Sequence, residues 1–147
     1  MAFDDSAIAT IAQTIADGQE QRARIAMRRG DDARVRRFGE ALDADLPGAR
    51  IATMQLGPRS SVVDDEIGRA TDHALRDLEL LHGGDFDRAF AASEEKSLVT
   101  ALRVLDETLI PKAVDRELER RLVHMRGVLA EELSRANALA DALSVTE

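Results

Sequence analysis

The sequence contains no cysteine, no tryptophan and no tyrosine, and only three prolines. The absence of cysteine excludes disulfides, thiolate nucleophiles and sulfur-ligated metal sites. Aromatic residues make up only 3% of the 147 residues, so the chain offers no aromatic platform on which nucleic-acid bases could stack. The core must therefore consist of aliphatic residues, methionine and the four phenylalanines, which favours close helix–helix packing over a β-sandwich.

Basic residues are outnumbered by acidic ones: the chain has 20 Lys and Arg and 28 Asp and Glu, which gives a net charge of −8 at pH 7. Phosphate backbones repel such a chain, so nucleic acid is not expected as a partner. One local exception is a group of arginines around the first predicted helix end. We interpret it as a solvated corner that pairs with nearby acids, or alternatively as a docking patch: Arg28, Arg29, Arg34, Arg36 and Arg37.

No apolar run approaches the roughly 20 residues that a transmembrane helix needs, so no membrane span is expected. The N-terminus, MAFDDSAIATIAQTIA, has two aspartates where a signal peptide carries positive charge. As it stands the chain is expected in the cytoplasm, or in the periplasm or envelope if a leader was removed.

Apolar residues recur at three- and four-residue steps, which predicts helices. Five are expected, over about 6–29, 31–55, 66–81, 85–109 and 112–143, with a loop over 56–65. The third should be the short one. Pro47 should kink or break the second near Asp45–Leu46, because proline removes a helical hydrogen bond. Gly18 interrupts the first, at a cost of about 1 kcal/mol unless a neighbouring helix needs close approach.

Capping residues mark the expected helix ends. Asp5 or Ser6 should cap the first helix, Asp64 or Asp65 the third and Asp85 the fourth. Pro111 should stand at the start of the last helix.

The last predicted helix has the most regular inward stripe, with alternating four- and three-residue steps typical of near-parallel bundle packing. Its members are Leu118, Leu122, Met125, Leu129, Glu132, Ala136, Leu139 and Leu143. The sequence therefore predicts an all-α, up-and-down four-helix bundle with one additional short helix. We expect a single domain over residues 1–147, with its core over about 6–143.

Three segments resemble a ferritin-like bacterial family called domain of unknown function 4142. They are RVRRFGEALDADLPGA, GGDFDRAFAASEEKSLVTAL and HMRGVLAEELSRANALADAL. The resemblance covers about residues 8–143 and is strongest around Gly83, Phe86, Asp87 and Phe90. It implies a ferritin-like bundle with Phe86 and Phe90 as core anchors, in a family that is usually exported.

The same resemblance shows departures at every histidine of the family pattern. Where the family has Asp-His, this chain has Asp45-Leu46, and the two later histidine positions carry Ser97 and Glu132. Phe90 replaces a tyrosine and Gly127 a proline. The resemblance therefore implies a degenerate site at Leu46, Ser97 and Glu132, all on inward stripes.

Of these three positions, only Glu132 could bind a metal ion strongly, and iron or manganese needs several ligands in one place. We therefore expect no metal and no other cofactor. A carboxylate on the inward stripe must be paired or protonated. Arg22 could pair with Glu132, or Ser97 or Gln19 could hydrogen-bond to it. A partly exposed position or a functional carboxylate are the alternatives.

Catalytic motifs are missing, with no nucleophile elbow, no Ser-His-Asp order and no phosphate-binding glycine loop. We therefore expect a non-catalytic bundle, an interaction or structural and stress-related module whose partner is another protein or a second copy in a homodimer. The alternative function is a metal-binding ferritin-like protein with a reduced carboxylate site for iron or manganese. A third hypothesis is an apolar ligand pocket inside the bundle, permitted by small residues on several stripes.

Overall fold

The computed structural model describes residues 4–51 and 61–145, and within these ranges the chain forms helices and no strand. The long helices are α1 (Asp5–Arg29), α2 (Ala33–Asp45), α3 (Val62–Glu79), α4 (Gly83–Val104) and α6 (Arg116–Val145). Shorter pieces connect them: a 3₁₀ turn (Leu46–Ala49), a π-helical turn (Leu105–Leu109) and α5 (Ile110–Lys112). The predicted all-α class is confirmed.

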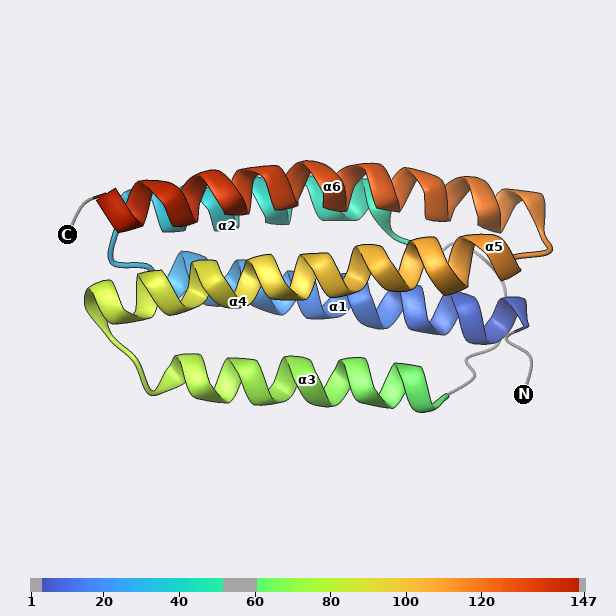
Figure 1. Ribbon diagram of the computed structural model, residues 1–147, viewed down its shortest axis with the longest axis horizontal. Coiled ribbons are helices and arrows are strands. Elements are labelled where there is room, and N and C mark those ends of the chain that lie inside the picture. The colour runs from blue at the N-terminus through green and yellow to red at the C-terminus, as the bar shows by residue number, and fades with distance from the viewer. Residues whose placement is uncertain (1–3, 52–60, 146–147) are drawn as a thin grey trace.

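The helices lie in three layers (Figure 1). Helices α2 and α6 form one outer layer, α1 and α4 form the middle layer, and α3 lies on the far side of the middle layer. Each long helix runs antiparallel to the one before it, so the up-and-down order holds across all five long helices. Helices α2 and α4, which precede and follow α3 in the chain, therefore run parallel. The additional helix is α3, but it is not the short one: it has 18 residues, whereas α2 has 13.

Pro47 acts as predicted. Helix α2 ends at Asp45, and the chain continues as the 3₁₀ turn that contains the proline. The part of the prediction that falls on residues 52–60 lies outside the described residues. The predicted loop was wrong over 62–65, because α3 already begins at Val62, where the Ser61 hydroxyl accepts a hydrogen bond from the Asp64 N–H at 3.1 Å.

The cap of α1 lies one residue before the predicted caps: it is Asp4, whose carboxylate accepts a hydrogen bond from the Ala7 N–H at 2.9 Å. Asp5 makes a contact with a different part of the chain. Its carboxylate accepts hydrogen bonds from the N–H groups of Val114 and Asp115, both at 3.0 Å, just ahead of α6. The aspartate predicted as a cap therefore ties the start of the first helix to the start of the last.

Two further predicted boundaries were wrong. Helix α4 begins at Gly83, which has φ +57°, so Asp85 lies in the first turn and is not the cap. Pro111 lies in α5, and α6 starts only at Arg116. The π-helical turn just before Pro111 widens the backbone where proline would crowd a regular α-helix.

The core is aliphatic with a small aromatic cluster. All eight residues of the predicted α6 stripe are buried. Phe86 and Phe90, the predicted anchors, are fully buried with ring centroids 6.1 Å apart, and Phe90 meets Phe38 of α2 edge-on at 5.9 Å. No helix in the described ranges is long and apolar enough to cross a bilayer.

Glycine lets two neighbouring helices approach α1 closely. A Cβ on Gly18 would lie 2.9 Å from Thr71 Oγ1 of α3, which explains this glycine inside a helix. A Cβ on Gly39 of α2 would lie 2.7 Å from the Ala23 carbonyl oxygen. The interruption noted in the sequence is therefore a packing contact between α1 and α3.

Candidate functional site

Glu132 is fully buried on the inward face of α6, as its place on the stripe predicted. Its partner is Arg135, one turn along the same helix, whose Nη1 donates to Glu132 Oε1 at 2.6 Å and to Asp45 Oδ2 of α2 at 2.8 Å. The predicted partners Arg22, Ser97 and Gln19 were wrong. Arg135 instead bridges two carboxylates and joins α6 to the end of α2.

The pKa of Glu132 is raised from its ordinary 4.5 to about 7, chiefly by burial and also by the neighbouring carboxyls of Asp45 and Glu94, whereas Arg135 opposes the rise. Its second oxygen, Oε2, has no hydrogen-bond partner among the described residues. The carboxyl therefore takes up a proton near neutral pH.

A second polar group is buried between α1 and α4, and we call it the Glu94 cluster. Its members are Gln19, Arg22, Ser93, Glu94 and Ser97. Glu94 is fully buried, and Arg22 Nη1 lies 3.7 Å from its Oε1. With the Gln19 amide nitrogen turned toward Glu94, Gln19 donates to Glu94 Oε2 at 2.7 Å and accepts from Ser97 Oγ at 3.0 Å. Burial raises the pKa of Glu94 to about 7, against the opposing effects of Arg22 and Gln19.

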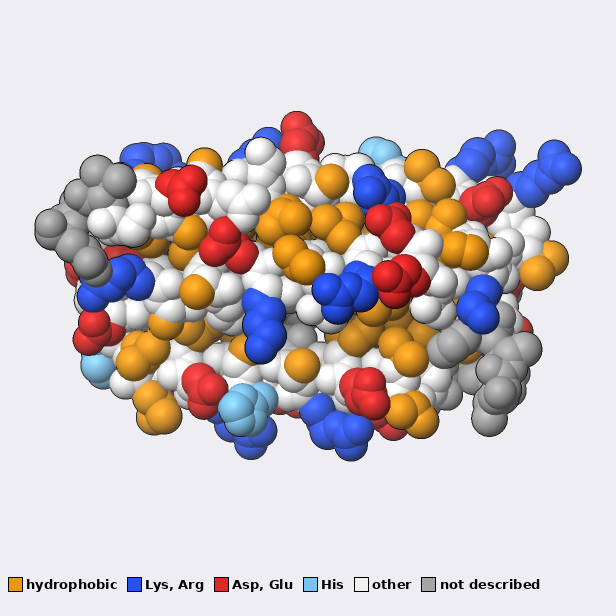
Figure 2. Space-filling model, in the orientation of Figure 1, with side chains coloured by type: hydrophobic (Ala, Val, Ile, Leu, Met, Phe, Trp, Pro, Cys, Tyr) orange, Lys and Arg blue, Asp and Glu red, His pale blue; other side chains and the backbone are white. Residues whose placement is uncertain are grey.

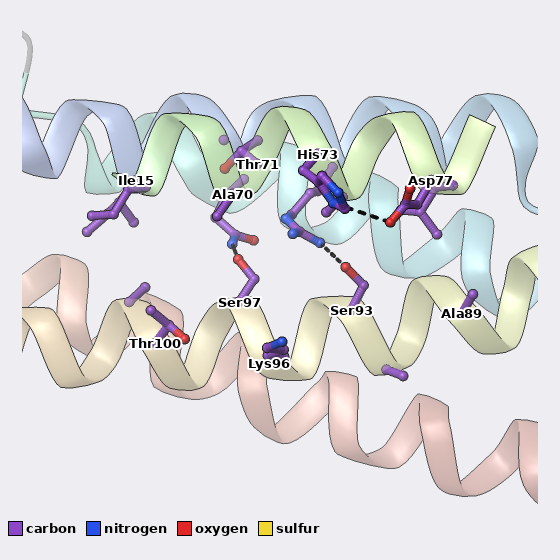
Figure 3. A pocket seen from close by; sticks show the side chains of 18 of the residues that line it. Ile15, Ala70, Thr71, His73, Asp77, Ala89, Ser93, Lys96, Ser97 and Thr100 are labelled. Atoms are coloured by element: carbon purple, nitrogen blue, oxygen red, sulfur yellow. Dashed lines mark hydrogen bonds and ion pairs between the residues drawn. The ribbon is translucent and has the colours of Figure 1, made fainter. Parts of the chain in front are cut away.

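A groove of about 640 Å³ opens between α1, α3 and α4 (Figure 3). Most of its lining is apolar or small, including Ile15, Ile67, Ala70, Leu78 and Ala89. In the space-filling view hydrophobic side chains are visible along the furrow between α3 and α4 (Figure 2). This volume lies within the range of small-molecule sites, about 300–1,000 Å³.

Polar groups converge on one side of this groove. Ser93 and Ser97 point from α4 toward α1 (Figure 3), where they meet Arg22 and Gln19. Arg22 Nη1 donates to Ser93 Oγ at 2.9 Å. At the rim, His73 Nδ1 lies 3.3 Å from Asp77 Oδ2, both on α3. The groove thus combines apolar walls with a few directed polar groups, as ligand sites do.

The family model that matches this chain is described as domain of unknown function (DUF4142), and it matches residues 1–139. The chain belongs to the DUF4142 family. Comparison with curated proteins and with solved structures found no match. Membership confirms the family resemblance of the sequence, and the family carries no assigned function. The ferritin-like assignment stays a prediction.

Of the three positions that the DUF4142 resemblance marked, one lies in the apolar core and the other two belong to two different polar groups. Leu46 is buried in the core at the start of the 3₁₀ turn. Ser97 belongs to the Glu94 cluster, whereas Glu132 pairs with Arg135. The link between the groups is the electrostatic effect of Glu94 on Glu132.

Sequence reasoning placed Ser97 on an inward stripe but missed Glu94, one turn earlier on the same helix. The signal was present, since the buried positions of α4 include 87, 91, 94, 98 and 101, at alternating four- and three-residue steps. Sequence reasoning also missed the structural role of Asp87. This buried carboxylate accepts hydrogen bonds from the N–H groups of Asp31 at 2.9 Å and Asp32 at 2.8 Å, and so anchors the α1–α2 connection on α4.

The arginine patch consists largely of internal contacts. Arg28 and Arg29 both pair with Glu79 at the end of α3, and Arg29 donates to the Leu81 carbonyl at 2.6 Å.

The remaining patch residues lie on α2. Arg34 pairs with Asp32 at 2.8 Å, and Arg36 donates to the carbonyls of Gly30 and Asp31. Arg37 is exposed. Arg28, Arg29 and Arg36 thus connect the ends of α1, α2 and α3, whereas Arg34 makes a local contact at the start of α2. A docking role for the patch stays a prediction.

Across the part of the chain that the structure describes, no group of three or more His, Cys, Asp or Glu side chains lies close enough to hold a metal ion. The buried carboxylates at Glu94 and Glu132 face guanidinium groups. The metal-binding alternative stays a prediction.

Proposed function

We propose that this DUF4142 protein is a non-catalytic binding protein, and that the groove between α1, α3 and α4 takes up a small apolar or amphiphilic molecule. The observation that carries the proposal is the groove itself, at about 640 Å³ with mostly apolar walls. This develops the apolar-pocket hypothesis. The protein partner or second copy expected from the sequence stays a prediction. The molar mass of the purified protein in solution tests whether a second copy binds.

The packing of α3 supports this role. Leu78 is the one buried residue of α3, whereas the groove-lining Ile67 and Ala74 remain half-buried. An apolar ligand in the groove would complete their burial, and each Å² of apolar surface removed from water contributes about 25 cal/mol.

Titration of the purified protein with the neutral apolar dye N-phenyl-1-naphthylamine tests the proposal. We expect saturable binding of one dye per chain. Ala70→Phe should weaken dye binding about tenfold, because Ala70 lines the groove and is exposed enough to accept a larger side chain. The matched control is Ala138→Phe, at an exposed position of α6 outside the groove, which should bind like the parent.

The absence of saturable dye binding would contradict the proposal. Equal binding by the parent and by Ala70→Phe would also contradict it, because the dye would then bind elsewhere.

A further inference from the structure

Arg22 is an unusual group to find in the wall of an apolar groove. It lies near the end of α1, is 4% exposed, and lines the space between α1, α3 and α4. A guanidinium carries five N–H donors and no acceptor, and burying it is unfavourable unless acceptors surround it. The hydrogen bonds and ion pairs of Arg22 therefore decide whether the burial of its guanidinium is compensated.

Those contacts leave part of the guanidinium unsatisfied. Nη1 donates to Ser93 Oγ, but Glu94 Oε1 is 3.7 Å away, beyond hydrogen-bond range. Nε has no hydrogen-bond partner among the residues that the structure describes. Glu94 is also a weak counter-ion near neutral pH, because burial raises its pKa to about 7. The structure thus holds a buried cation with an unused donor beside a cavity.

The other charged groups of the groove do not supply the missing anion. Asp77 is on α3 and faces His73 at 3.3 Å. Lys96 of α4 lines the groove as a second cation, and no ion pair involving it is seen in the described ranges. The unmatched charge of the groove is therefore positive, although the chain as a whole carries −8.

We infer that the ligand of this groove is an amphiphile with an anionic head group, a carboxylate on an aliphatic chain, and that Arg22 is its counter-ion. This inference rests on the proposed function of the groove. The head group accepts from the guanidinium while the aliphatic chain lies against Ile67 and Leu78. Because Arg22 is 4% exposed, the ligand enters as a single molecule, and a head group held in a membrane surface does not reach it.

Displacement of the bound naphthylamine dye compares three ligands with a ten-carbon chain on the whole protein at about pH 6, where an alkyl carboxylate is ionised and Glu94 is mostly protonated. They are decanoate, decanol and decyltrimethylammonium. We expect decanoate to bind about tenfold more tightly than decanol, and the cationic ligand most weakly. Vesicles of an anionic phospholipid should not sediment the protein. Arg22-dependent sedimentation would overturn the assignment to a single free molecule.

Two variants test whether Arg22 is the source of the preference for decanoate over decanol. Arg22→Met should lose the preference and bind decanoate and decanol with equal affinity. Arg24→Met should retain the preference, since Arg24 is an exposed arginine of the same helix that pairs with Glu20. The Nε–H resonance of Arg22 should shift with decanoate and not with decanol, a readout that needs no folded variant.

The displacement experiment distinguishes failure of the head-group assignment from failure of the proposed function. Equal affinity of the parent protein for decanoate and decanol, or dye binding that decanoate does not displace, would overturn the anionic head group and leave the proposed binding function standing. If the parent protein binds neither the dye nor decanoate nor decanol, the proposed function itself is overturned.

Discussion

The buried carboxyl of Glu132 predicts how the stability of the protein depends on pH. Its folded-state pKa is raised from 4.5 to about 7, which corresponds to about 3 kcal/mol between its protonated and ionised forms. A raised folded pKa means that the folded state binds the proton more tightly than the unfolded state. The contribution is therefore fully present below about pH 4.5 and is lost as the pH rises through about 7.

Replacing Glu132 with Gln removes this titration while keeping the shape of the side chain and an oxygen for Arg135. At about pH 5 the variant and the parent should have similar free energies of unfolding, since both side chains are neutral. At about pH 9 we expect Glu132→Gln to be more stable by about 2–3 kcal/mol, because the parent must keep an ionised carboxyl buried. The variant should thus show a flatter stability profile.

Urea unfolding followed by far-ultraviolet circular dichroism over this pH range measures the difference. Glu131→Gln is the matched control, an exposed carboxyl on the same helix whose removal should leave the pH profile parallel to that of the parent. If Glu132→Gln also runs parallel to the parent, or is less stable at the alkaline end, the reasoning is refuted. Arg135 would then compensate the ionised carboxylate in full.

Three other predictions concern packing, charge and metal. Gly39→Ala should destabilise by about 1–3 kcal/mol in urea unfolding, because its Cβ would meet the Ala23 carbonyl oxygen, whereas Gly127→Ala, with open space around it, should stabilise by about 1 kcal/mol. Arg135→Leu should destabilise by about 2 kcal/mol or more above pH 7 and less at about pH 5, because it leaves the ionised carboxylate of Glu132 buried without its cation. Elemental analysis of protein purified without chelator and offered iron, manganese and zinc should find less than one metal per chain, and stoichiometric metal that is lost in Glu132→Ala would support the metal-binding alternative instead.

Features set by local periodicity could be predicted from the sequence. The eight inward positions of α6 and the break at Pro47 follow from spacing and from the missing proline N–H, and neither depends on a distant residue. Helix starts were harder, because several acidic residues compete near each one. Asp4 caps α1, while Asp5 is used by Val114 and Asp115, more than a hundred residues away in the sequence.

The candidate site depended on tertiary placement that spacing does not report. Arg22 and Ser93 are 71 residues apart, and only the packing of α1 against α4 brings them together. The groove arises because α3 lies outside the four-helix bundle and presents small residues such as Ala70 and Ala74 toward α1 and α4. The sequence could place those alanines on one face, but it could not show that the space opposite them stays open.

The two buried glutamates have a common structural solution. Each lies on an inward face, where an ionised carboxylate needs a cation close by. Arg22 lies near Glu94 and Arg135 binds Glu132, so each buried carboxylate has a guanidinium group of the same chain beside it. The pairs differ in one respect that matters for function. Arg135 is 43% exposed and also holds Asp45, whereas Arg22 is buried, has an unused donor and lines a cavity. Charge balance in the first pair therefore holds the bundle together, and incomplete balance in the second leaves a position that an anionic ligand can fill.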